Sequence, residues 1–144
     1  MKILVLNGPN LNILGIRDNN IYGEMSLGAI NQMLQTQADK QSIALLFFQS
    51  NHEGALIDFL QKNAQSAQGV LINPGALTHY GYALRDALID TTLPIVEVHL
   101  SDITKREDFR KTNVLEGIIL DQVMGMKEKS YTEGLKKLIE HIKK

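Results

Sequence analysis

Short apolar runs alternate along the chain with segments in which apolar residues recur at helical spacing. Runs of strand length cover residues 2–7, 43–49, 69–73 and 94–100, and a fifth begins at 117–120. Helical periodicity follows in segments after residue 26, from about residue 53, around 80–88 and over 131–142. The first of these segments opens with Ser26, a residue type that often caps a helix N-terminus. The pattern therefore predicts strands and helices in alternation.

This alternation predicts an α/β fold, because each crossover between parallel strands lays a helix on the sheet. Five strands in 144 residues fit the smaller doubly wound, flavodoxin-like arrangement, a parallel sheet of order 2-1-3-4-5. A chain of this length is typical of one domain with one core, so we expect residues 1–144 to form a single flavodoxin-like domain. In such sheets, ligands bind beyond the carboxyl ends of the strands.

Polar residues of types that can bind ligands or take part in catalysis gather where the predicted strands end. The four segments concerned are NGPNLNILGIRDNNIYG (7–23), SNHEG (50–54), NPGALTHYG (73–81) and SDITKREDFR (101–110), the last preceded by Glu97 and His99. They hold most of the histidines and arginines of the chain, together with several asparagines. Imidazole, amide and guanidinium groups in one place suit a small polyhydroxylated anion better than a phosphate or a divalent cation.

The composition narrows the class of protein. The net charge of −1 gives no electrostatic case for a nucleic-acid partner. No apolar run approaches the roughly 18 residues of a membrane span, so no membrane partner is expected. The chain has no cysteine, which excludes disulfides and thiolate metal sites and makes the cytoplasm the expected location.

Several chemistries lack their sequence signals. Neither GxxxxGK[ST] nor GxGxxG occurs, so the chain lacks the usual phosphate-binding loops of nucleotide-binding proteins. The GxSxG motif that carries the nucleophilic serine of α/β-hydrolases is also absent. No His, Asp and Glu grouping has a familiar metal spacing, and we expect no metal site. Only Lys105 lies near the strand ends, which argues against a Schiff-base mechanism.

Each candidate residue also has a structural interpretation. NGPN and NPGA are common turn sequences, and His99 on an apolar strand is by default a satisfied core residue. Arg106 and Arg110 could lie on a solvated helical face, while Tyr22 could simply pack with its hydroxyl in water. These interpretations leave the shared location of the residues unexplained, which favours a common site.

Taken together, four segments resemble one enzyme family. NGPNLNILGIR with YG, QSNHEG, INPGALTHY with ALRDAL, and EVHLSDITKREDFR match the type II 3-dehydroquinate dehydratases in order and spacing, over residues 1 to about 113. The resemblance implies a cofactor-free dehydration of 3-dehydroquinate to 3-dehydroshikimate, by anti elimination through an enolate, in the shikimate pathway of aromatic amino acid biosynthesis or in quinate catabolism. The chain departs from the family at Asp102, at Thr104 and over 114–131.

Those departures keep a second hypothesis open. Asp102 would add a negative charge beside the site expected for the substrate carboxylate. A non-catalytic flavodoxin-like module that holds a small carboxylic acid is therefore an alternative, and flavin binding is a third possibility.

The resemblance also implies roles for individual residues. It makes Tyr22 the base and His99 the general acid, with Glu97 orienting His99. It implies that Arg17 belongs to a mobile lid, that Arg106 lies near the tyrosine, and that Asn10 positions catalytic groups. The residues implied to bind substrate are Asn73, His79 and Arg110 at the hydroxyls, the Leu100 and Ser101 amides at the carboxylate, and Asp86 from a neighbouring subunit. Asn73 is also implied to hold a water that faces the enolate oxygen. The family assembles as homododecamers, tetramers of trimers, which we expect here.

The long first loop fits these roles. A tyrosine has an ordinary pKa near 10, so a tyrosine that acts as a base at neutral pH must favour its anion by about 4 kcal/mol. Arg17, five residues before Tyr22, and Arg106 are the cations that could supply this preference. We expect the loop to open for substrate and then to close over it and exclude water.

Overall fold

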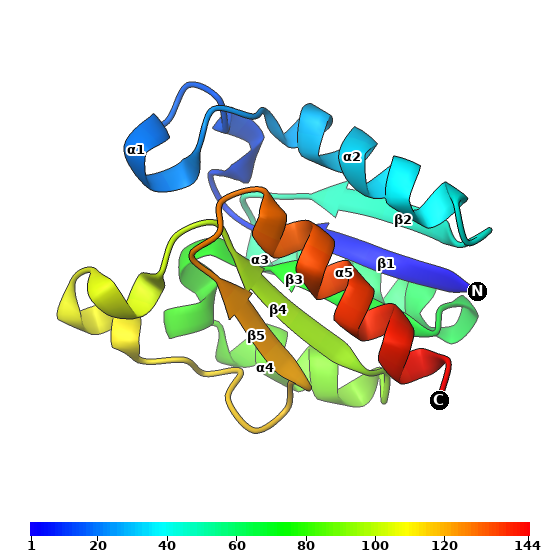
Figure 1. The fold of residues 1–144 in the computed structure, drawn as a ribbon. Coiled ribbons are helices and arrows are strands. Elements are labelled where there is room, and N and C mark those ends of the chain that lie inside the picture. The colour runs from blue at the N-terminus through cyan, green and yellow to red at the C-terminus, as the bar shows by residue number, and fades with distance from the viewer.

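The computed structural model describes residues 1–144 and contains one parallel sheet of five strands in the order β2-β1-β3-β4-β5, as the sequence predicts. The strands are β1 (Lys2–Asn7), β2 (Ala44–Gln49), β3 (Gly69–Asn73), β4 (Ile95–His99) and β5 (Asp121–Met124). The α-helices are α1 (Asn19–Tyr22), α2 (Leu27–Asp39), α3 (Glu53–Asn63), α4 (Tyr82–Asp90) and α5 (Lys129–Ile142). All the strands run in one direction, so their carboxyl ends meet at one edge of the sheet (Figure 1).

The sheet is covered on both faces, by α2 and α5 on one side and by α3 and α4 on the other (Figure 1). Side chains of successive strand residues point to opposite faces. In β1, Ile3 and Val5 accordingly join the core beneath α2 and α5, whereas Leu4 and Leu6 join the core beneath α3 and α4. This two-sided burial explains why the strands are continuous apolar runs.

The fifth strand lies later in the sequence than predicted. β5 begins at Asp121, whereas the apolar run 117–120 forms a turn in which the Ile118 amide donates to the Leu115 carbonyl. Gly117 has a φ of +87°, a left-handed conformation that suits glycine and does not occur within a β-strand. The side chains of Ile118 and Ile119 are partly buried against the core beneath α3 and α4, which explains why this turn is apolar.

The long first loop contains short helical elements. After β1 it forms a 3₁₀ turn, η1 (Leu11–Ile13), and then the single turn α1, capped by the Asp18 side chain, which accepts a bond from the Asn20 amide. Ser26 caps α2 as predicted, because its Oγ accepts a bond from the Ala29 amide. The loop thus extends beyond the carboxyl edge of the sheet (Figure 1).

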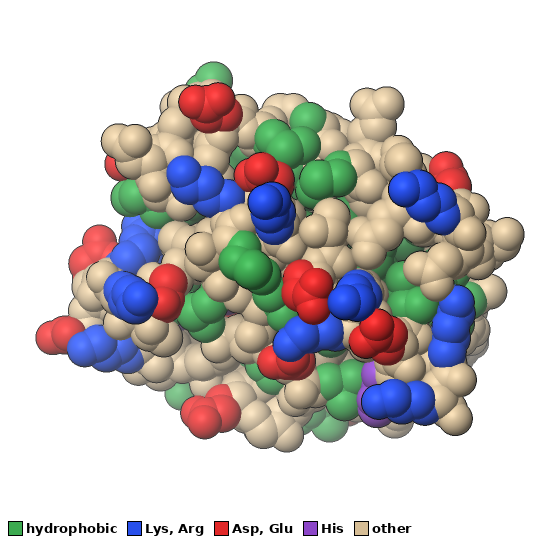
Figure 2. Space-filling model, viewed as in Figure 1, with side chains coloured by type: hydrophobic (Ala, Val, Ile, Leu, Met, Phe, Trp, Pro, Cys, Tyr) green, Lys and Arg blue, Asp and Glu red, His purple; other side chains and the backbone are tan.

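The face that carries α2 and α5 shows basic and acidic side chains interspersed, without a large area of either sign (Figure 2). None of the helices is both long enough and apolar enough to cross a bilayer.

Candidate active site

A cavity of about 110 Å³ lies beyond the carboxyl ends of β1, β3 and β4. It is enclosed by the first loop, by the segment that contains η3 (Gly75–His79), and by the segment of η4 (Ile103–Lys105) and η5 (Asp108–Lys111). Its lining is Pro9, Asn10, Leu11, Arg17, Tyr22, Asn73, Gly75, Ala76, His79, His99, Leu100, Ser101, Ile103, Arg106 and Arg110.

Most of the residues singled out from the sequence meet in this cavity. Those that line it are Asn10, Arg17, Tyr22, Asn73, His79, His99, Leu100, Ser101, Arg106 and Arg110. Glu97 lies behind the wall, bonded to His99. Asp86 is exposed on α4 and does not line the cavity of its own chain.

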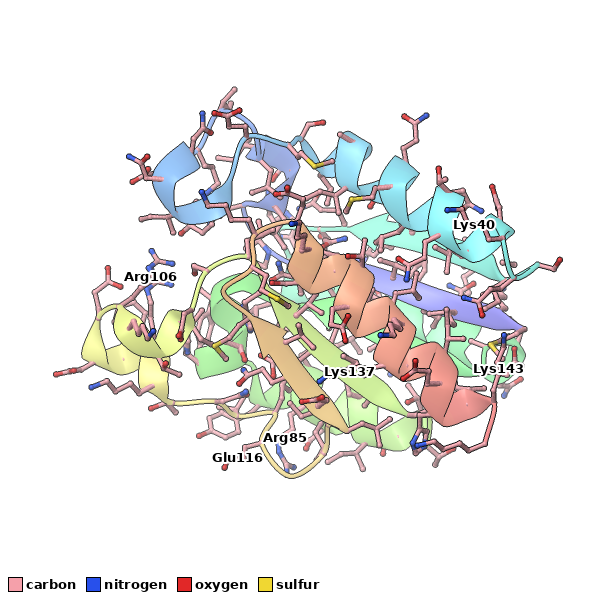
Figure 3. All side chains as sticks on the ribbon, in the orientation of Figure 1. Lys40, Arg85, Arg106, Glu116, Lys137 and Lys143 are labelled. Atoms are coloured by element: carbon pink, nitrogen blue, oxygen red, sulfur yellow. The ribbon has the colours of Figure 1, made fainter.

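Two arginines surround the Tyr22 ring. Arg17 Nη2 donates to the Tyr22 hydroxyl at 3.0 Å, and the Arg17 guanidinium carbon lies 3.9 Å from the ring centroid. The Arg106 guanidinium carbon is 5.3 Å from the same centroid, and Arg106 extends from its loop toward α1 (Figure 3). The guanidinium groups of Arg17 and Arg106 therefore both lie close to the Tyr22 phenol, and all three side chains line the cavity.

His99 is held by a buried carboxylate. Its Nε2 lies 2.6 Å from Glu97 Oε1, and both side chains are almost completely buried. The carboxylate also accepts bonds from the Thr78 hydroxyl and, at 2.8 Å, from Asn113 Nδ2. Burial alone would raise the pKa of Glu97, but the bonds and charge from His99, Thr78 and Asn113 together hold that pKa below its ordinary value.

Glu97 is therefore an anion at neutral pH, and an anion there favours a proton on Nε2 of His99. Nδ1 of His99 remains available to the cavity that His99 lines.

His79 presents a different form of imidazole. Desolvation by burial lowers its pKa, with a further contribution from the Arg110 charge, so the ring is neutral at pH 7. Its Nδ1 lies 2.7 Å from the Thr112 carbonyl and must donate to it, which leaves Nε2 as an acceptor. His79 can thus accept a hydrogen bond from a hydroxyl group in the cavity.

The lining carries positive charge and no carboxylate. Arg106 Nη1 reaches Ser101 Oγ at 3.5 Å, and Arg110 Nε donates to Glu107, whose side chain is exposed. The two arginines do not share a helical face, because Arg106 follows η4 whereas Arg110 lies within η5. Such a lining is suited to a small organic anion.

Asp102 does not bring its charge into the cavity. Its Oδ1 accepts bonds from the Thr104 amide at 3.1 Å and the Thr104 hydroxyl at 2.5 Å. Asp102 and Thr104, the two residues that depart from the family pattern in this segment, therefore bond to each other, and neither lines the cavity.

The sequence did not single out three residues that support the site. Thr78 and Asn113 hold Glu97, and Tyr131 bonds to Asn73. Thr78 lies within the strand-end segment 73–81, so its position was a usable signal. Asn113 and Tyr131 lie far along the chain from their partners, and no local pattern marks them.

Fold and site together define a flavodoxin-like α/β protein with acid–base groups in a cationic cavity. The family model for dehydroquinase class II matches residues 1–139. A 3-dehydroquinate dehydratase of Roseiflexus castenholzii is 51% identical over 139 residues, which are 96% of this chain and 88% of that protein. One of Carboxydothermus hydrogenoformans is 49% identical over 144 residues, 100% of this chain and 94% of that protein.

Solved structures show the same likeness. The type II dehydroquinase of Butyrivibrio crossotus superposes with a TM-score of 0.93 at 43% identity, covering 96% of this chain and 97% of that one. The type II dehydroquinase of Propionibacterium acnes gives a TM-score of 0.89 at 32% identity, covering 99% and 97%. The chain belongs to the class II dehydroquinase family.

Proposed function

We propose that this protein dehydrates 3-dehydroquinate to 3-dehydroshikimate, in the shikimate pathway or in quinate catabolism. One observation carries the proposal beyond family membership: a phenol beside two guanidinium groups and an imidazole bonded to a carboxylate face the same cavity. These are the base and the acid that an elimination of water needs.

The reaction begins with proton removal. The Tyr22 phenolate takes a proton from the carbon next to the substrate ketone, and the electrons of that C–H bond pass to the ketone oxygen as an enolate. Arg17 and Arg106 lie against the Tyr22 ring, where their charges attract the negative charge of the base. Asn10 lines the same cavity, and we assign it the role of positioning these groups.

The second step expels water. The enolate re-forms the ketone, the new C=C bond forms, and the C–O bond of the ring hydroxyl breaks as His99 gives that oxygen a proton. Glu97 orients the His99 ring through the bond to its Nε2. Anti elimination requires the base and the acid to act on opposite faces of the ring. Tyr22 comes from the first loop and His99 from the end of β4.

The rest of the lining accounts for substrate recognition. The Leu100 and Ser101 backbone amides bind the carboxylate beside Arg106. His79 accepts from a substrate hydroxyl, and Arg110 and Asn73 donate to others. Asp86 belongs to this set only if a neighbouring copy supplies it, because in its own chain it is exposed on α4.

Residues 1–144 then act as one catalytic domain within a larger assembly. We place the enzyme in the cytoplasm as a homododecamer, a tetramer of trimers in which Asp86 reaches the site of the next subunit.

The direct test is an absorbance assay. Purified protein mixed with 3-dehydroquinate, without added metal or nucleotide, is expected to generate the ultraviolet absorbance of a conjugated enone. Absence of signal at high enzyme concentration, with tight binding by calorimetry, would contradict the proposal and favour a binding module. A yellow protein would point to flavin instead. Covalent trapping by borohydride would contradict the enolate route.

Tyr22→Phe separates binding from chemistry. It removes the base while keeping the ring between the two arginines, so kcat is expected to fall at least about a hundredfold, with product affinity little changed. Tyr80→Phe, at an exposed position outside the cavity, is the matched control and keeps normal turnover. Near-normal turnover of Tyr22→Phe would assign the base to another group.

A further inference from the structure

The hydroxyl of Tyr131, in the first turn of α5, lies between two buried asparagines. Asn73 Nδ2 donates to the Tyr131 oxygen at 2.9 Å, and that hydroxyl donates to Asn7 Oδ1 at 2.6 Å. Tyr131 is fully buried, and burial raises its pKa above the ordinary value, so it remains a neutral hydroxyl. Its single proton goes to Asn7, which leaves a lone pair to accept from Asn73.

This contact fixes which way the Asn73 amide faces. Asn73 Oδ1 accepts a bond from the Gly75 amide at 3.1 Å, while Nδ2 donates to Tyr131. Rotating the Asn73 amide by half a turn would place its NH₂ group against the Gly75 amide N–H. The bonds to Gly75 and to Tyr131 would then both be lost. The second proton on Nδ2 remains for the cavity that Asn73 lines.

The same hydroxyl joins the two loops that begin beneath the cavity. Asn7 and Asn73 are register partners at the ends of β1 and β3, and the Gly8 amide donates to the Asn73 carbonyl at 2.8 Å. The loops touch closely, because a Cβ on Gly8 would lie only 2.3 Å from the Pro74 carbonyl oxygen. Tyr131 therefore links α5 to both loops at one point.

We propose that Tyr131 is a positioning residue whose hydroxyl holds Asn73 as an N–H donor toward an oxygen atom of the substrate or of a water bound beside it. The inference rests on the function proposed above and deepens it. Tyr131 itself does not line the cavity, so it acts only through Asn73 and Asn7.

Tyr131→Phe tests this with the ring retained and the hydroxyl removed. Loss of one buried hydrogen bond that orders a donor is expected to lower kcat/KM about tenfold. Ser130→Ala is the matched control, because Ser130 is equally buried and its Oγ accepts only from the Met126 amide. It is expected to leave kcat/KM within about twofold of the wild type, even if it lowers the unfolding temperature.

A double-mutant cycle shows whether the effect passes through Asn73. In an Asn73→Ala background, adding Tyr131→Phe is expected to change kcat/KM less than about twofold, because the donor is already gone. If Asn73→Ala is too slow to assay, the cycle is measured on product affinity by calorimetry. Normal activity of Tyr131→Phe, or an equal loss in both backgrounds, would overturn the proposal.

A second variant covers the case in which Tyr131→Phe does not fold, and an NMR measurement tests the inference without requiring turnover. If Tyr131→Phe does not fold, Asn7→Ala, which removes the other partner of the hydroxyl, enters the same cycle with a smaller expected loss. The side-chain amide NMR signal of Asn73, assigned by its absence in Asn73→Ala, is expected to shift in Tyr131→Phe and not in Ser130→Ala. An unchanged signal would overturn the inference, whereas wild-type protein without turnover would contradict the function alone.

Discussion

At the scale of the residue, Glu97 shows how a single side chain depends on its partners. It is buried on the apolar strand β4, where an unpaired carboxylate would be costly, yet its anion is satisfied by His99, Thr78 and Asn113. Removing any one of these bonds leaves a buried polar atom unsatisfied, which costs more than the bond itself contributed.

Glu97→Gln is expected to lower the free energy of unfolding at pH 7 by about 1.5 to 3 kcal/mol, the contribution of bonds to a charged group. The folded-state pKa of Glu97 lies below its unfolded value. The contribution of the carboxylate is therefore complete above the unfolded value and is lost as the pH falls through the folded one. Urea unfolding of both proteins at successive pH values measures this difference. The difference in free energy of unfolding between the two proteins is expected to become smaller in acid. A difference that stays constant down to about pH 3 would contradict the linkage.

At the scale of the element, the position of α5 depends on a residue without a side chain. A Cβ on Gly134 would lie 2.4 Å from Val98 Cγ1 and 3.1 Å from Leu71 Cδ1, so the helix rests almost directly on the sheet. Valine is stiff about χ1 and cannot easily move aside. The same close approach brings Tyr131, one turn earlier in α5, to the strand ends.

Gly134→Ala is expected to destabilise the protein by about 1 to 3 kcal/mol through overpacking, despite the better helix propensity of alanine. Gly54→Ala is the matched control, because Gly54 is also helical, in α3, and a Cβ there would meet nothing within 4 Å. It is expected to be neutral or stabilising by up to about 1 kcal/mol. Chemical denaturation compares the two, and equal effects would show that packing does not decide the position of α5.

At the scale of the whole molecule, the proposed role of Asp86 requires a second subunit. Tyr22→Phe and Asp86→Ala proteins are each expected to be impaired alone. When they are mixed and co-assembled in equal amounts, about a quarter of the sites gain an intact Tyr22 from one chain and an intact Asp86 from the next. The activity assay is expected to show this recovery. A mixture of Tyr22→Phe with His99→Asn is the control and stays inactive, because both residues line the cavity of one chain. Absence of recovery in the first mixture would contradict sharing of the site.

The sequence predicted the sheet order and the Ser26 cap, because the alternation of strands and helices and the capping residue are visible in local patterns. Three of the four predicted strand-end segments contribute to the cavity, whereas the segment 50–54 does not line it. The fifth strand was placed too early, since apolar character alone cannot separate an extended run from a partly buried turn such as 117–120. The roles of Tyr22, His99 and the other site residues remain proposals that the experiments above test.

The chain by itself determined the alternation of strands and helices, and with it the edge at which the polar segments meet, because backbone periodicity and crossover handedness are local properties. Only the tertiary structure decided which distant groups support the site. Asn113 reaches Glu97 and Tyr131 reaches Asn73 because strand and helix packing brings them within hydrogen-bond distance. The same packing turns Asp102 away from the cavity and sets the pKa of His79 through burial, a property that no stretch of sequence carries alone.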